Sequence, residues 1–122
     1  HSCVTAPVQI AGIEALKGDQ KYVKNMVKEF NIRRNFLTEK LNNIKNIECV
    51  KPGGAFYVFP KVNKLNYNSK EIADYLLEKK YLATVPGSAF GKNGEGFLRI
   101  SYASNMENLK KSIECLESFM AE

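Results

Sequence analysis

The longest regular pattern of apolar and polar residues runs from about residue 19 to residue 44. Apolar side chains recur there every three or four positions, which predicts a long helix with one apolar stripe. The stripe consists of Val23, Met26, Val27, Phe30, Leu37, Leu41 and Ile44. Asp19 is expected to cap this helix. A shorter helix is expected before it, capped by Thr5 and ended by Lys17-Gly18.

Two further helices are predicted in the second half of the chain. The first starts at Asn68 or Ser69 and has apolar residues at the same spacing. The last starts at a capping box that runs from Ser104 to Glu107. Its apolar stripe consists of Leu109, Ile113, Leu116 and Met120. Both helices are therefore expected to cover a core with one face.

Four short segments have the composition of strands: residues 47–50, 55–59, 81–85 and 97–102. The turn-forming run KPGG at 51–54 separates the first two, which predicts that they pair as a hairpin. The expected order is ααββαββα, without internal repeats. This order predicts an α+β fold, in which helices cover a small, mostly antiparallel sheet.

Composition indicates an ordinary globular protein and excludes several classes. The chain has 122 residues, of which 44% are hydrophobic and 25% charged, and a net charge of +5. The lysines are scattered, so the charge allows binding to polyanions without requiring it, and we expect no nucleic-acid partner. No apolar run is long enough for a membrane span, so no membrane partner is expected. The three cysteines are far apart and there is one histidine, which predicts reduced packing residues in a cytosolic protein and no metal site.

The glycine-rich stretch at 85–96 fits no phosphate-binding motif. Gly87 and Gly91 are one residue too close for a P-loop, and the later glycines lead into a strand where a dinucleotide-binding motif needs a helix. A histidine-assisted nucleophile is excluded as well, because the single histidine is His1. No complete set of catalytic residues is therefore expected in this chain.

The run GEGFLRI at 94–100 loosely resembles the base-stacking strand of RNA-recognition domains. That motif needs aromatic rings at positions that are here occupied by Glu95, Phe97 and Ile100. Only one ring remains, and a carboxylate repels the phosphate backbone. The order of helices and strands also differs, so RNA binding is not the preferred interpretation.

Arg99 is the most informative residue of this run, because it stands inside an apolar strand. Alternation places Phe97, Arg99 and Ser101 on one face, and Leu98, Ile100 and Tyr102 on the other. Burying a guanidinium is unfavourable unless an anion compensates its charge. From the residues alone two explanations stay open: a solvated or internally paired arginine, or one that binds the carboxylate of a ligand in bidentate fashion.

Several motifs in the same order resemble the C-terminal part of class I and II aminotransferases, most closely those of the bacterial aspartate aminotransferase type. They are PGGAFYVFP at 52–60, VPGSAFG at 85–91 and GEGFLRISYA at 94–103, with SCVTAPVQIA at 2–11 and the pair Arg33-Arg34 before them. The resemblance extends over essentially the whole chain.

The resemblance implies a fold type I enzyme that uses pyridoxal 5'-phosphate, usually as a homodimer with active sites at the subunit interface. Such an enzyme moves an amino group between an amino acid, here expected to be aspartate, and a 2-oxo acid. The residue at the position of Arg99 binds the substrate α-carboxylate, and the rings at Phe56 and Phe90 border the substrate pocket. Plain packing roles remain open for both rings, and a solvated helix face is expected for Arg33 and Arg34.

The chain departs from the family in one important respect. No segment resembles the half that carries the Schiff-base lysine, the aspartate at the pyridine nitrogen and the phosphate-binding groups. Residues 1–18 are therefore expected to be the last helix and linker of a large domain, and residues 19–122 the small domain. By itself the chain is expected to bind no cofactor and to be inactive. A related lyase, an aminotransferase-like regulator domain and a stand-alone module that binds small acids remain alternatives.

Overall fold

The computed structural model describes residues 3–122. Four α-helices occur in this part of the chain: α1 (Ala6–Lys17), α2 (Lys21–Asn42), α3 (Ser69–Lys80) and α4 (Met106–Ala121). The strands are short: β1 (Ile47–Glu48), β2 (Tyr57–Val58), β3 (Lys61–Val62), β4 (Val85–Pro86) and β5 (Leu98–Ser101). Two 3₁₀ helices, η1 (Gly87–Phe90) and η2 (Lys92–Gly94), form the glycine-rich segment between β4 and β5.

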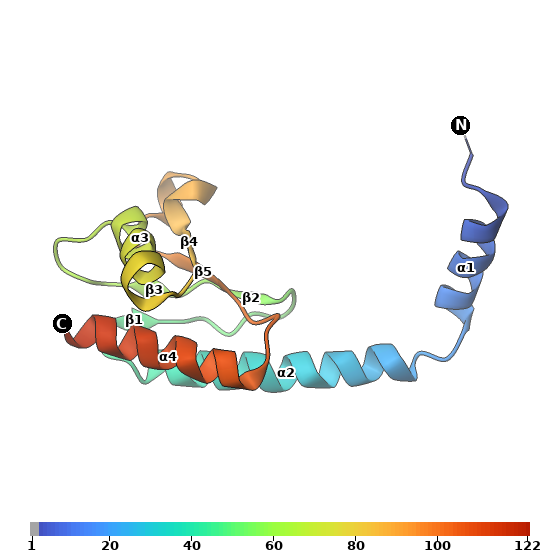
Figure 1. Cartoon of the computed structure of the whole chain (residues 1–122), viewed down its shortest axis with the longest axis horizontal. Helices are drawn as coiled ribbons and strands as arrows, with labels where there is room; N and C mark the ends of the chain where they lie inside the picture. Colours follow the sequence, from blue (N-terminus) through green and yellow to red (C-terminus); the bar gives the residue numbers. More distant parts are fainter. Residues whose placement is uncertain (1–2) are drawn as a thin grey trace.

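The strands form two small antiparallel sheets. One has the order β2-β5-β4, and the other pairs β1 with β3. Helices α2 and α4 lie side by side along the sheets, while α3 lies beside β4 and α4 (Figure 1). The predicted α+β class, a small antiparallel sheet covered by helices, is confirmed.

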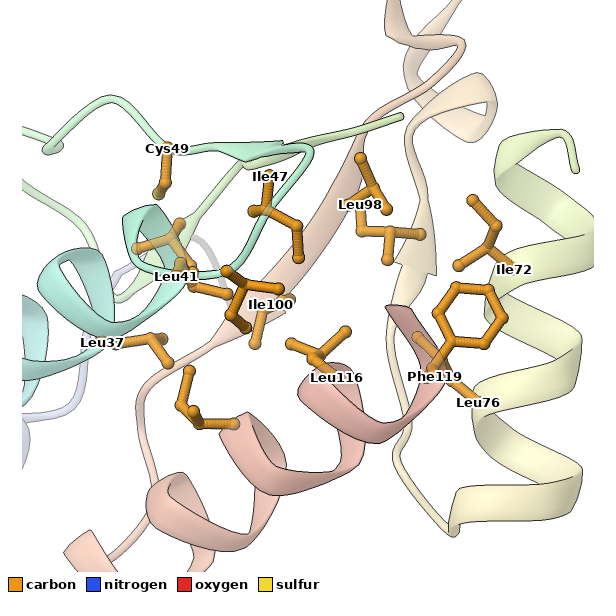
Figure 2. Close-up of a cluster of buried hydrophobic side chains, with 14 of the residues drawn as sticks. Leu37, Leu41, Ile47, Cys49, Ile72, Leu76, Leu98, Ile100, Leu116 and Phe119 are labelled. Carbon is orange, nitrogen blue, oxygen red and sulfur yellow. The ribbon is translucent and has the colours of Figure 1, made fainter. Parts of the chain in front are cut away.

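One hydrophobic core joins the helices to the inner face of the sheets. Leu37 and Leu41 from α2 meet Ile100 of β5 and Leu116 of α4, and Phe119 extends the core towards α3 (Figure 2). These five side chains are at most 3% exposed. Such burial stabilises by roughly 1.5–3 kcal/mol for each large apolar side chain, so this core organises the body of the chain.

The predicted hairpin between residues 47–50 and 55–59 is wrong. β1 pairs with β3, with Ile47 opposite Val62, whereas β2 pairs with β5. The segment at 60–68, where no strand was predicted, thus supplies β3. Strands of two residues carry too few side chains to specify a partner locally, so packing in the core selects the pairing.

Three boundaries also differ from expectation. The strand expected at 81–85 is reduced to Val85–Pro86, because Tyr81 ends α3 in a left-handed conformation with φ 55°. Helix α4 is capped by Asn105, whose side chain accepts from the Asn108 N–H, so the capping box from Ser104 to Glu107 does not form. Helix α2 begins at Lys21, although the Asp19 carboxylate does accept from the Lys21 N–H.

The N-terminal part of the chain stands away from the core. Helix α1 contains no buried residue and projects from the far end of α2 (Figure 1). The first half of the predicted α2 stripe is exposed too: Val23, Met26 and Val27 are 44–53% accessible. Only the second half, from Leu37 onwards, is buried as the pattern predicts.

Candidate functional site

Arg99 lies on β5, the central strand of the three-stranded sheet, on the face opposite to the core. Its flanking residues Leu98 and Ile100 are buried, whereas Arg99 is half-buried, as the alternation predicts. On one side Arg99 is paired with Val85 of β4. On the other side Tyr57 of β2 is paired with Ser101, so the tyrosine lies diagonally across from Arg99 on the same face.

Two aromatic rings hold the Arg99 guanidinium. Its central carbon lies 4.5 Å from the centroid of the Tyr57 ring and 4.9 Å from that of Phe90. Both distances are within the range of a cation–π interaction. Within residues 3–122, the Arg99 guanidinium makes no hydrogen bond or ion pair with the protein. The rings therefore hold the cation without neutralising it, and its N–H donors remain available to an anion.

Phe90 itself is supported by two more rings. Phe59 packs edge-on against Phe90 at 5.9 Å and is stacked on Phe97 at 5.2 Å. Phe90 comes from η1, Phe97 directly precedes β5, and Phe59 directly follows β2. The cluster limits how far the Phe90 ring can move, although Phe90 is still 53% exposed.

The structure places Phe56, the other ring predicted to border the substrate, in a different position. Phe56 packs against Tyr57 with ring centroids 4.3 Å apart, but does not lie over the guanidinium. It lines a mostly apolar groove of about 290 Å³ between α2, the loop at 53–55 and Tyr102. Of the three predicted residues, Arg99 and Phe90 are therefore in contact, and Phe56 is one ring away.

The sequence did not predict Tyr57 as a ring beside Arg99. The motif analysis favoured the neighbouring Phe56, and no property of residues 55–59 distinguishes one ring from the other without knowing which strand pairs with β2. Had the pairing of β2 with β5 been known, the two-residue periodicity would have identified Tyr57.

The Arg33-Arg34 pair is less solvated than expected, because both side chains are half-buried. The Arg34 guanidinium donates to the Pro52 carbonyl at 3.2 Å, which ties α2 to the loop that leads into β2. Arg33 forms an ion pair with Glu29 at 3.6 Å and lies over the Phe30 ring. The expected solvated face is therefore wrong for both arginines.

Residues 3–122 contain no group of three or more His, Cys, Asp or Glu side chains that could hold a metal ion. Nor does any helix in this part of the chain have both the length and the apolar character needed to cross a membrane. The Arg99 guanidinium indicates a ligand on its own evidence, because its N–H donors have no protein acceptor among residues 3–122.

Comparison with known proteins identifies the family. The family described as aminotransferase class I and II matches residues 1–116, and the chain belongs to it. The chain is 43% identical over 116 residues to an aspartate aminotransferase of Pyrococcus horikoshii, covering 93% of this chain and 30% of the relative. It is 36% identical to aromatic-amino-acid aminotransferase 2 of Thermococcus litoralis, covering 99% of this chain and 31% of that one.

Solved structures give the same result. The alanine aminotransferase from Pyrococcus furiosus superposes with a TM-score of 0.91 at 35% identity, over 98% of this chain and 30% of that one. The aspartate aminotransferase from Rhizobium meliloti superposes with a TM-score of 0.87 at 34% identity, over 98% of this chain and 32% of that one. The chain thus spans about 30% of the length of the relatives it matches.

Proposed function

We propose that this chain is the C-terminal, substrate-carboxylate-binding part of an aminotransferase. In this proposal residues 19–122 are the small domain, and residues 1–18 are the last helix and linker of a large domain. The separation of α1 from the core supports this division, because α1 contains no buried residue whereas the segment from Leu37 onwards has a core of its own.

The observation that carries the proposal is the state of Arg99. Its guanidinium lies on two rings and has no acceptor among residues 3–122. A carboxylate can accept two parallel N–H bonds from a guanidinium, which fixes both its position and its orientation. For an α-amino acid or a 2-oxo acid, this contact would orient the bonds at the reacting carbon and thus lower the entropic part of the barrier.

Pyridoxal 5'-phosphate would supply the electron-accepting chemistry of the complete enzyme. The described residues do not fit as its binding site. Neither the groove beside Arg34 nor the ring cluster around Arg99 contains a lysine amine that could form a Schiff base. The cofactor is accordingly assigned to the rest of the polypeptide, and this chain alone is expected to be inactive.

The complete enzyme is proposed to be a cytosolic homodimer that transfers an amino group from an amino acid to a 2-oxo acid. Aspartate is the first substrate to test, since several relatives are named aspartate aminotransferases. Others are named aromatic and aspartate/prephenate aminotransferases, so the side-chain preference has to be measured. The eight curated relatives compared are all named aminotransferases, which favours this function over a lyase, a regulator or a stand-alone binding module.

The test is steady-state kinetics of the full-length enzyme with Arg99→Ala. Loss of the bidentate contact is expected to raise KM for both the amino acid and the oxo acid, and to lower kcat/KM by about 2 to 4 kcal/mol in transition-state free energy. Arg99→Lys is expected to restore only part of this, because a lysine cannot reproduce the planar fork.

Lys111→Ala is the control for the loss of one positive charge. Lys111 is exposed on α4, where it pairs with Glu107, and it lies over none of the rings around Arg99. Its removal is expected to leave both KM values unchanged. Unaltered kinetics in the Arg99→Ala enzyme would refute the assignment, and elimination or lyase products without amino transfer would favour the alternative enzyme class.

A further inference from the structure

We infer that Glu95 is a positioning residue for the carboxylate site: it ties the segment that carries Phe90 to the start of α3 and so keeps the Phe90 ring on Arg99. This inference rests on the proposed function of Arg99. It concerns a residue that does not itself contact the guanidinium.

The Glu95 carboxylate is bound at the N-terminus of α3. Its Oε1 accepts from the Ser69 backbone N–H at 2.7 Å and from the Gly96 N–H at 3.0 Å, and its Oε2 accepts from the Ser69 hydroxyl at 3.0 Å. A negative charge is favourable at a helix N-terminus, where backbone N–H groups lack helical partners. These hydrogen bonds, first that of the Ser69 N–H, hold the pKa of Glu95 below its ordinary value, so the carboxylate is charged near neutral pH.

Ser69 transmits this interaction to the 3₁₀ helix η1. Its side-chain oxygen lies 3.0 Å from that of Ser88, and Ser69 is 1% exposed. A hydroxyl has one proton, and a charged carboxylate can only accept. The Ser69 proton therefore goes to Glu95, and the Ser88 hydroxyl donates to Ser69. The charge on Glu95 thus orders a chain of hydrogen bonds that ends on η1.

Phe90 stands two residues after Ser88 in η1, and its ring covers Arg99 at 4.9 Å. The same segment is attached to the sheet by Gly87, whose N–H donates to the Phe97 carbonyl at 2.7 Å. Gly87 and Gly94 are in such close contact that a Cβ on either would lie 2.0 Å from the other's carbonyl oxygen. The backbone thus fixes the start of η1, and the link from Glu95 through Ser69 to Ser88 fixes the part next to Phe90.

Glu71 provides a matched control. Its carboxylate also serves the N-terminus of α3, where it accepts from the Asn68 N–H at 2.8 Å and completes a capping box. Glu71 makes no hydrogen bond to Ser69 or Ser88 among residues 3–122. Its removal should thus weaken the helix start without releasing η1.

The experiment measures KM, kcat and melting temperature in the full-length enzyme. Glu95→Ala is expected to raise KM for both carboxylate substrates about twofold to threefold, as for partial loss of one exposed cation–π contact, and to change kcat less than the KM. Glu95→Gln keeps one acceptor oxygen and is therefore expected to raise KM less than Glu95→Ala does. Glu71→Ala should lower the melting temperature and leave KM unchanged.

Double variants test the route of the effect. Phe90→Ala is expected to raise KM, and adding Glu95→Ala to it should raise KM no further, because the two residues act through the same contact. Unchanged KM in Glu95→Ala, an equal rise in Glu71→Ala, or fully additive effects with Phe90→Ala would each overturn the inference. If Arg99→Ala also leaves KM unchanged, the proposed function fails; if only the Glu95 variant is silent, the positioning role alone fails.

Discussion

The Arg99 guanidinium lies over the Tyr57 ring of the neighbouring strand, with 4.5 Å between the guanidinium carbon and the ring centroid. The contact follows from the register of β2 and β5, in which Tyr57 is opposite Ser101, two residues from Arg99. Because both strands belong to the sheet, this contact is fixed more firmly than the one with Phe90, which depends on a 3₁₀ segment. We regard Tyr57 as the more rigid side of the proposed carboxylate site.

Replacing Tyr57 tests this assignment. Tyr57→Leu removes the ring face and is expected to raise KM for carboxylate substrates about twofold to fivefold, as for loss of an exposed cation–π contact. Tyr57→Phe is the control, because the Tyr57 hydroxyl makes no hydrogen bond in the described part of the chain and the ring is retained. In steady-state kinetics of the full-length enzyme, the Tyr57→Phe variant should have a KM close to that of the wild type. An equal rise in KM in the Tyr57→Leu and Tyr57→Phe variants would contradict the role of the ring.

A pair of leucines tests the division between core and projecting helix. Leu116 of α4 is fully buried, whereas Leu16 of α1 is 84% exposed. Leu116→Ala is expected to lower the free energy of unfolding of residues 1–122 by about 2–5 kcal/mol, because it leaves a cavity. Leu16→Ala should change it by less than about 0.5 kcal/mol. Denaturant titration measures both, and similar losses in the two variants would show that α1 is packed onto the core.

Acid stability should depend on Glu122. Hydrogen bonds from Lys80, with Nζ at 2.6 Å, and from Tyr75 lower the pKa of Glu122. A carboxyl group whose pKa is lower in the folded state stabilises the fold at pH values above its unfolded pKa of about 4.3. This contribution is lost as the pH falls through the folded pKa.

The corresponding measurement is the melting temperature between about pH 7 and pH 3. Glu122→Gln is expected to melt below the wild type at neutral pH, and the difference should shrink as the pH falls below about 4.3. Glu117→Gln is a control on α4, the helix that Glu122 directly follows, since the Glu117 side chain makes no hydrogen bond or ion pair in the described region. A difference between Glu122→Gln and the wild type that stays constant with pH would contradict the linkage.

Local patterns predicted the helices and the orientation of Arg99 well. Asn68 caps α3 with a capping box completed by Glu71, and Thr5 and Gly18 bound α1 as the residues indicate. The alternation around Arg99 holds because a period of two places neighbouring residues on opposite faces whichever strand lies beside them. The helix ends and the face on which Arg99 lies depend on residues that are close in the sequence, so the sequence alone is enough to predict them.

The contacts made by Glu95 show the opposite case. In the sequence Glu95 served as evidence against RNA binding, whereas in the structure it caps a helix that begins 26 residues earlier. Likewise, the partner of β2 is a strand about 40 residues away along the chain rather than the nearest one. Such contacts depend on how the core closes, which no short window of residues specifies.

The amino-acid sequence by itself determined the fold class and the four helices. It also determined that Arg99, on an otherwise apolar strand, lies on the face opposite to the core. Only the tertiary structure decided that Tyr57 and Phe90 are the rings on that cation and that no acidic side chain of residues 3–122 neutralises it. The physical reason is that helix periodicity and strand alternation are local, whereas strands of two residues acquire partners only through the shared hydrophobic core.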